Sequence, residues 1–192
     1  LAYEVNNSFV RDRVYGNLRA DWQITRDISL MVRYGLDNIN ENRQTKMANG
    51  YTNNPLGAYG VTHIGNFEGN ADFLANYKKE LGGFSLSVSV GGNTRYQNGS
   101  TEKTASKDGT GLIVPGIYTL QNILPANLDY NTYTYKKQVN SIYEMATLGY
   151  KDMVYLDVSG RTDWSSTLPG AKGYFYPSAS LSVLVNEIMG IR

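Results

Sequence analysis

The sequence lacks several features that would assign it to a common class of protein. It has no cysteine, which excludes disulfides and thiolate metal sites. With 18 basic and 17 acidic residues, its formal net charge of +1 gives no basic excess of the kind that nucleic-acid binders carry. No apolar run approaches the 18 residues of a membrane helix. The first residues, Leu1 to Glu4, have neither the basic nor the apolar region of a signal peptide, so we expect a mature chain or a piece of a longer one.

Residues that favour strands and turns dominate the composition. Tyrosine occurs 16 times and glycine 20 times, and asparagine, serine and threonine are also frequent. The mean hydropathy of −0.39 is typical of soluble proteins. It is also compatible with a membrane β-barrel, whose strands turn half of their residues away from lipid. The composition therefore predicts an all-β protein and leaves its environment open.

Apolar and polar residues alternate along most of the sequence, with little sign of helical periodicity. This period of two is typical of strands that have one apolar and one polar face. We expect about seven strands, most of them about ten residues long or longer. The clearest stretches are residues 14–24, 28–36, 67–79, 84–90, 138–150, 154–160 and 179–185.

The expected connections alternate between short and long. Short turns are predicted at 25–27, 80–83 and 151–153, and long polar loops at 38–63, 94–137 and 164–175. Outer-membrane barrels have short periplasmic turns and long extracellular loops, so this order favours an antiparallel transmembrane β-barrel. Aromatic residues near the turns, such as Trp22 and Tyr150, fit the belts of rings at membrane interfaces.

The polar faces indicate that the chain is one part of a larger barrel. Charged residues such as Arg19, Arg33 and Asp157 lie on the faces opposite the apolar stripes, and in a small barrel they would be buried at high cost. A wide, wet interior needs more strands than seven. Residues 188–192 also read as the start of another short turn. We therefore interpret residues 1–192 as part of a single barrel domain.

Four stretches resemble the SusC/RagA-like family of TonB-dependent outer-membrane transporters. The most specific is YLDVSGRTDWSSTLP at residues 155–169. Shorter matches support it: DRVYGNL at 12–18, NADFLANY at 70–77 and YFYPS at 174–178. The resemblance follows the chain in order and is weakest in the expected long loops.

This resemblance implies a 22-stranded barrel with a plug domain that is not in this sequence. It implies TonB-dependent import of oligosaccharides or peptides across the outer membrane, a surface lipoprotein partner of the SusD type, contact with TonB through the plug and contact with membrane lipid. No cofactor and no nucleic acid are implied. The chain would be a multi-pass part of the barrel wall and its extracellular loops, and the sequence names neither the substrate nor the lipoprotein.

Catalysis is not expected. Ser165 and Ser166 follow Asp163, but nucleophilic catalysis needs a base within reach. The single histidine, His63, lies in a different loop and has no metal-ligand spacing around it. The stretch from Asp163 to Pro169 instead predicts the exit of a strand at the extracellular rim. We expect a transport protein, not an enzyme.

Polar and aromatic groups near the outer ends of the strands are the candidates for substrate contact. Aromatic faces stack on sugar rings, and amide, carboxylate and guanidinium groups bond to hydroxyls. The lumen and mouth candidates are Tyr15, Asn17, Arg33, Asp37, Asn93 and Asp163. In the long loop, Tyr118, Tyr130 and Tyr133 are candidates for contact with substrate or lipoprotein.

Two alternatives stay open at the level of sequence. A siderophore or cobalamin receptor has the same architecture and differs in its cargo. A secreted carbohydrate-binding β-sandwich would instead pack its apolar stripes against each other.

Overall fold

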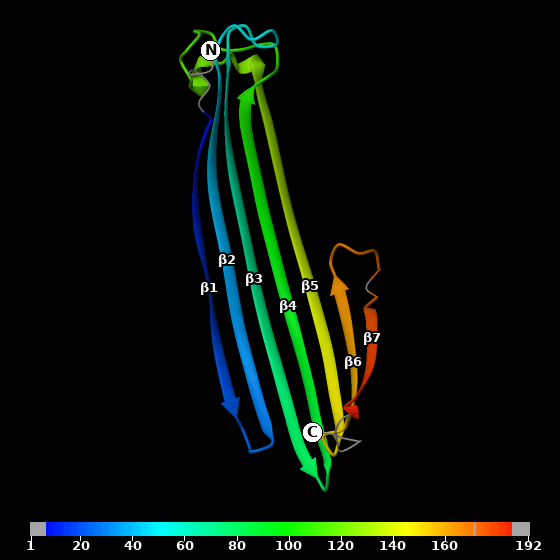
Figure 1. Ribbon diagram of the computed structural model, residues 1–192. Coiled ribbons are helices and arrows are strands. Elements are labelled where there is room, and N and C mark those ends of the chain that lie inside the picture. The colour runs from blue at the N-terminus through cyan, green and yellow to red at the C-terminus, as the bar shows by residue number, and fades with distance from the viewer. Residues whose placement is uncertain (1–6, 171, 186–192) are drawn as a thin grey trace. The chain divides into compact units, whose positions relative to one another are not determined.

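The computed structural model describes residues 7–170 and 172–185, and most of these residues lie in strands. Seven strands form one sheet in the order β1-β2-β3-β4-β5-β6-β7, so neighbours in sequence are neighbours in space (Figure 1). The strands β5, β6 and β7 pair antiparallel. The expected number of strands and the all-β class are therefore confirmed. The strands are β1 (Ser8–Gln23), β2 (Ile28–Met47), β3 (Ala58–Leu81), β4 (Phe84–Ser106), β5 (Leu128–Tyr150), β6 (Val154–Ser165) and β7 (Tyr174–Val183).

Three tight turns occur where the sequence predicts them. Gly82 and Gly83 connect β3 to β4, and both have positive φ angles, of 55° and 91°. Two consecutive positive φ angles suit a two-residue hairpin turn, because its twist matches that of the strands. Lys151 and Asp152 adopt positive φ between β5 and β6. The turn between β1 and β2 is held by the Thr25 hydroxyl, which accepts a hydrogen bond from the backbone N–H of Ile28 at 3.1 Å.

The expected long loops at 38–63 and 94–137 are wrong over much of their length. Strand β2 continues to Met47, β3 starts at Ala58, β4 continues to Ser106 and β5 starts at Leu128. In these segments alternation of apolar with polar residues fades, but backbone hydrogen bonds still pair the strands. The third expected loop, 164–175, is nearly right, because β6 ends at Ser165 and β7 starts at Tyr174.

The chain divides into two units, and strands β1 to β5 contribute to both. Unit 1 contains residues 1–15, 37–68 and 97–136, and unit 2 contains residues 16–36, 69–96 and 137–192. The expected turn at 188–192 and the amino-terminal residues 1–4 lie outside the described residues.

Unit 1 has a small hydrophobic core, to which its loops contribute. Tyr59, Leu112 and Ile123 are buried together, and Tyr118 and Leu128 pack against them. Two short 3-10 turns, η1 (Leu120–Asn122) and η2 (Pro125–Asn127), lie in the same segment.

Buried amides connect the loops of unit 1. The side chain of Asn122 donates to the carbonyl oxygens of Val114 and Ile117 at 2.7 and 2.6 Å. The Asn54 side-chain oxygen accepts from the backbone N–H of Gly109 at 3.0 Å. Such bonds offset the cost of burying the amides and fix the loop backbone.

Unit 2 carries its apolar residues on one face of the sheet, and that face is exposed. Leu18 is 81% exposed and Leu181 is 66% exposed. The register aligns them in rows across the sheet, since Leu148 pairs with Leu156 and Leu156 with Leu181. We call this side the apolar face. Its alternating residues extend over 16–22, 28–36, 69–77, 84–92, 142–150, 154–160 and 175–183.

Five of these stretches have nine residues and two have seven, against the 9–11 residues with which a tilted strand crosses the hydrocarbon layer of a membrane. The carboxylate of Glu144 interrupts the face in β5, next to Gly160, whose missing side chain leaves room for it. Among the described residues, no helix is long and apolar enough to cross a membrane.

Candidate functional site

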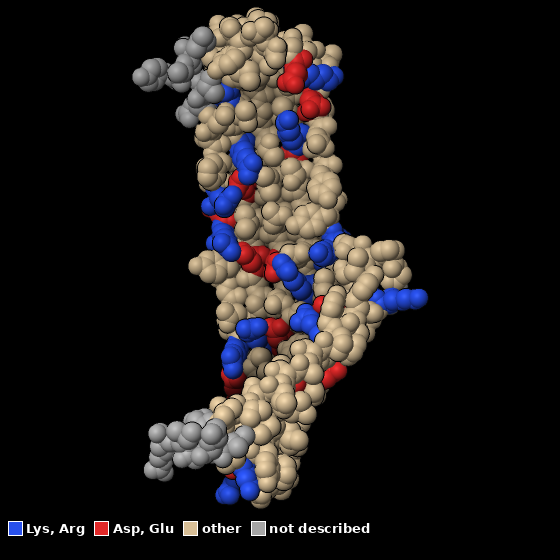
Figure 2. Space-filling model, turned by 45° about the vertical axis from the view of Figure 1, so that its right-hand side comes forward, with Lys and Arg blue, Asp and Glu red and all other residues tan. Residues whose placement is uncertain are grey.

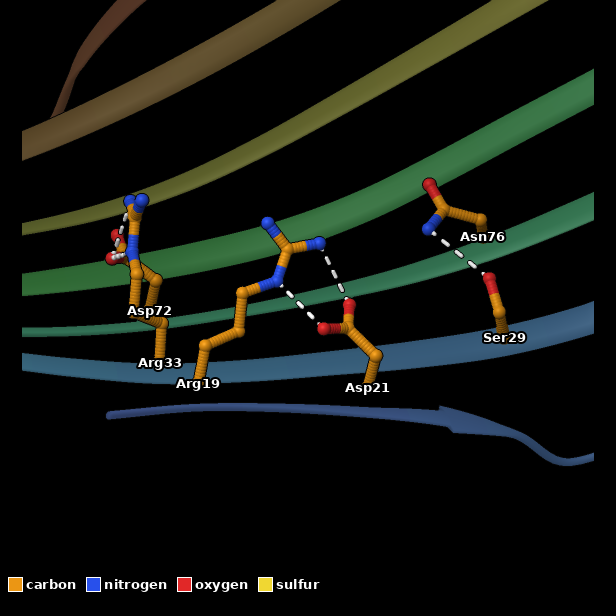
Figure 3. A network of polar contacts seen from close by, with 6 residues as sticks. All are labelled: Arg19, Asp21, Ser29, Arg33, Asp72 and Asn76. Atoms are coloured by element: carbon orange, nitrogen blue, oxygen red, sulfur yellow. Dashed lines mark hydrogen bonds and ion pairs between the residues drawn. The ribbon is translucent and has the colours of Figure 1, made fainter. Parts of the chain in front are cut away.

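The opposite side of the sheet, which we call the polar face, carries hydrogen-bonded polar side chains from six strands. In unit 2 its centre is Asp72 on β3. Arg33 on β2 donates to the Asp72 carboxylate at 2.9 Å (Figure 3). Asn93 on β4 donates to the same carboxylate at 2.5 Å. Asn93 also donates to the side chain of Asn70 at 2.6 Å. The side chains of three strands thus form one network, in which a guanidinium and amides surround a carboxylate.

A second row joins the same three strands nearer their tight turns. Asn76 on β3 donates to the Ser29 hydroxyl at 3.4 Å, and the Ser89 hydroxyl donates to the Asn76 carbonyl oxygen at 2.7 Å. Figure 3 draws the first of these bonds beside the pairing of Arg19 with Asp21 on β1, where two N–H···O contacts measure 2.7 Å each.

The polar face continues across β5 and β6. Arg161 donates to Asp163 at 2.7 Å and to the buried hydroxyl of Ser141 at 2.9 Å. Its guanidinium also lies 5.9 Å from the ring centroid of Tyr143. That ring lies over Gly91, where any side chain would collide with it. Glycine on β4 therefore makes room for an aromatic residue that spans towards Arg161.

Unit 1 carries further ion pairs of this face along β1 and β2. Arg13 donates to Asp37 through two contacts of 2.9 and 2.5 Å, the bidentate geometry that suits guanidinium and carboxylate. Glu41 accepts from both Arg11 and Arg43. The guanidinium of Arg13 lowers the pKa of Asp37. The pKa of the Glu41 carboxyl is also held below its ordinary value, first by Arg43 and then by Arg11.

Positive and negative groups therefore alternate instead of forming a patch of one sign. Figure 2 shows basic and acidic side chains next to one another on the face in view. Each exposed ion pair on such a surface contributes little to stability, because water competes for the charged groups.

The structure brings some of the predicted contact residues together and separates others. Arg33 and Asn93 meet at Asp72. Asp37 pairs with Arg13, and Asp163 pairs with Arg161. Tyr15 is 72% exposed, and its ring lies 4.9 Å from the Arg13 guanidinium. Asn17 packs beside Gly35 on the neighbouring strand.

The predicted loop residues have different environments. Tyr118 lies in the loop between β4 and β5 and packs on the core of unit 1, with its ring centroid 6.4 Å from that of Tyr59. Tyr130 and Tyr133 are not loop residues, because they lie on β5. Both are exposed, at 68% and 61%, so their side chains are free to touch another molecule.

The residues that sequence reasoning missed are the partners of the predicted ones. Asp72, Glu41 and Arg13 occupy polar positions in their strands, but the register between strands decides which side chains meet. Alternation along each strand could have placed them on the polar face without pairing them.

The serine pair and the histidine have structural roles. Ser166 accepts a hydrogen bond from the backbone N–H of Gln138 at 2.9 Å, and Ser165 lies 2.9 Å from the Thr167 hydroxyl. His63 bonds to Asn42. Within the described residues no group of three or more His, Cys, Asp or Glu side chains could hold a metal ion.

Comparison with known proteins gives matches at the level of structure. No family model matches the sequence, and no curated protein matches it. The whole chain aligns with 22% of a chain in the structure of the RagAB peptide transporter, with a TM-score of 0.84 and 17% identity. In its "open-open" state, the RagAB peptide importer matches 94% of this chain with a TM-score of 0.77 and 18% identity, over 20% of its own chain.

Receptors for siderophores match less well. The siderophore receptor PiuA from Acinetobacter baumannii matches 90% of this chain with a TM-score of 0.54 and 13% identity. BauA, the ferric preacinetobactin receptor from the same organism, matches 92% with a TM-score of 0.57 and 16% identity. This chain covers 29% of each of those chains.

The chain therefore spans about a fifth of the length of the RagAB chain that it resembles. The single antiparallel sheet excludes the β-sandwich alternative for the described residues, because their apolar face has no second sheet against it. The chain has the fold of a β-barrel segment of the TonB-dependent transporters, which agrees with the sequence resemblance to SusC/RagA-like proteins.

Proposed function

We propose that this chain forms part of the barrel wall of a TonB-dependent importer in the outer membrane. Residues 1–192 belong to one barrel domain of 22 strands, whose plug and other strands lie in the rest of the protein. The apolar face of unit 2 touches lipid, and the polar face lines the lumen. The substrate passes along the polar face when TonB displaces the plug.

The observation that carries this proposal is the two-sided chemistry of the sheet in unit 2. One face holds exposed rows such as Leu148, Leu156 and Leu181. The other holds the network around Asp72. Apolar patches of this extent on a water-soluble protein would favour aggregation, whereas acyl chains satisfy them. Water in the lumen hydrates the charged side chains of the polar face, whereas lipid would not.

Peptides are the cargo that we favour. The RagAB peptide transporter matches with a TM-score of 0.84, against 0.54 and 0.57 for the two siderophore receptors. The polar face offers guanidiniums, carboxylates and amides, which pair with the backbone and side chains of a peptide. Oligosaccharides are the second candidate cargo, because exposed rings such as Tyr15 provide stacking surfaces for sugars.

A SusD-type surface lipoprotein is the partner that we propose for the loops of unit 1. Apolar side chains of the loop between β4 and β5 are exposed, although that loop folds over a core of its own. Ile113 and Ile117 are each 51% exposed, and Val114 is 48% exposed. Exposed apolar side chains that are fixed by a folded loop are typical of contact surfaces for proteins.

Uptake by intact cells tests the proposal. A strain that lacks the full-length gene would be complemented with it and supplied with a peptide mixture, an oligosaccharide mixture or a ferric siderophore. We expect restored uptake of peptides, and we expect loss of that uptake when TonB is deleted. Uptake of only the ferric siderophore would favour the receptor alternative. Peptide uptake that persists without TonB would contradict the proposal.

A further inference from the structure

The polar face of unit 1 contains a three-residue cluster whose charge is not balanced. Glu41 is buried, with a side chain only 3% exposed, and it bonds to two arginines at once. Arg11 contacts one of its carboxylate oxygens through Nε at 2.5 Å, and Arg43 contacts the other through its own Nε. Two cations against one anion leave the cluster with a net charge of +1.

The two guanidiniums keep their outer nitrogens available. Each arginine donates to Glu41 through Nε. Among the described residues, the terminal Nη atoms of the two arginines contact no acceptor. The side chains are 50% and 52% exposed. They line an open depression of about 340 Å³ that also includes Phe9, whose ring lies 5.8 Å from the Arg11 guanidinium. A guanidinium held through Nε presents its terminal N–H groups in the fork geometry that suits a carboxylate.

The neighbouring ion pair on the same two strands differs in this respect. Arg13 uses both Nε and Nη2 for the two oxygens of Asp37, which leaves a neutral and closed pair. The cluster at Glu41 and the pair at Asp37 therefore provide a natural contrast between a site with a net positive charge and a neutral site.

We propose that Arg11 and Arg43, held side by side by Glu41, bind a carboxylate of the substrate and give the importer a preference for acidic peptides. This inference rests on the proposed function, since it assigns a substrate class to the same lumen wall. Glu41 orients the arginines and does not contact the substrate. The Phe9 ring contributes apolar surface beside the bound carboxylate.

Binding of matched peptides to the purified full-length transporter, together with its surface lipoprotein, tests the proposal. Two hexapeptides would be compared by titration calorimetry in detergent, identical except that glutamates in one are glutamines in the other. We expect the wild type to bind the acidic peptide about tenfold more tightly, since a charge-assisted contact is worth roughly that factor. The preference should shrink as salt is added.

Single substitutions test which residues provide the preference for the acidic peptide. Arg11→Gln and Arg43→Gln should each remove most of the preference for the acidic peptide, measured as the ratio of the dissociation constants of the two hexapeptides. Arg13→Gln is the matched control and should keep the preference. Arg43→Lys should retain part of it, because the charge remains while the fork is lost. Resistance of the folded barrel to unfolding in detergent gels would verify that each variant assembles.

Some results would overturn this inference while leaving the proposed function intact. Equal affinity of the wild type for both hexapeptides would do so, as would an unchanged preference in both glutamine variants. Binding of an acidic oligosaccharide in place of either peptide would contradict the peptide assignment. Failure of the proposed function would look different, because intact cells would then import no peptide at all.

Discussion

Both units of the sheet expose apolar side chains, but the buried apolar side chains of the described residues lie in unit 1. Unit 1 gathers Tyr59, Leu112 and Ile123 into a small core beneath its loops. Unit 2 leaves Leu18 and Leu181 exposed on one face of the sheet. Strands β1 to β5 run through both units, so strand structure alone does not define the environment. The difference agrees with the proposed contact of the apolar face of unit 2 with lipid.

Strand length agrees with this comparison. Strand β3 has 24 residues, and β4 and β5 have 23 each. These strands are more than twice as long as the 9–11 residues that cross the hydrocarbon layer. The remaining residues need no apolar face, and β2 accordingly continues as Asn40, Glu41 and Asn42. The proposed barrel accounts for both the length and the composition through a polar extension of the paired strands.

The largest expected effect comes from a charge on the apolar face. Val158→Arg should destabilise the barrel by about 2–4 kcal/mol, because a guanidinium would lie in the hydrocarbon layer. Thr132→Arg, at an exposed position of β5 in unit 1, should cost less than about 0.5 kcal/mol. Urea unfolding of the full-length barrel in lipid vesicles would measure both. Equal costs at the two positions would remove the distinction between the units.

A cavity in the core of unit 1 should have a large but local effect. Leu112 is 1% exposed, and Leu112→Ala should destabilise the loop core by about 2–3 kcal/mol. We expect faster proteolysis between β4 and β5 and no change in the unfolding of the barrel. Limited proteolysis combined with urea unfolding would separate the two. If the substitution lowered both the protease resistance of the loop and the stability of the barrel in urea, the loops and the barrel would unfold as one unit.

Breaking the network at Asp72 should have a moderate effect. Asp72→Ala removes the acceptor of Arg33 and Asn93, and we expect a loss of about 1 kcal/mol, since water in the lumen can replace part of these bonds. The midpoint of urea unfolding would report it. A loss as large as that of Val158→Arg would show that this face is dry, which the account does not allow.

The smallest expected effect is the acid response of Glu41. Hydrogen bonds from Arg43 and Arg11 lower the pKa of Glu41 in the folded protein. The ionised carboxylate therefore stabilises the fold at pH values above 4.5, which is the ordinary pKa of the group. That contribution is lost as the pH falls through the lowered pKa. The stability difference between the wild type and Glu41→Gln should therefore stay constant from neutral pH to about 5 and shrink below 4.5. Hydrogen exchange of the unit 1 strands at several pH values would measure it. A stability difference between the wild type and Glu41→Gln that grows as the pH falls would contradict the expected direction.

The sequence predicts unit 2 better than unit 1 for a physical reason. Alternation from Ile28 to Leu36 gives this part of β2 one apolar and one polar face, and it reveals the strand. From Asn38 to Met47 most residues on both sides are polar, and backbone pairing with side-chain contacts such as that of Arg11 with Glu41 maintains β2. Such a segment resembles a loop in sequence, which explains why the loop boundaries near residues 38 and 94 were wrong.

The candidate site could be predicted only as a face. The alternation places Arg33 and Asn93 on the polar side of their strands, but their meeting at Asp72 depends on the register of three strands. Likewise, the alternation places Asp37 on the polar face, whereas it does not predict the pairing of Asp37 with Arg13. The role of these residues in binding substrate stays a prediction.

The central claim is that alternate residues of unit 2 meet lipid and water, and spin-label accessibility along β6 tests it most directly. Single labels would replace each residue from Tyr155 to Asp163 in the full-length protein in lipid vesicles. Oxygen, which concentrates in lipid, should reach the labels at 156 and 158, and a water-soluble nickel complex should reach those at 157 and 161. We predict that the two profiles alternate with a period of two and in opposite phase. Profiles that rise and fall together, or that show no period of two, would contradict the account.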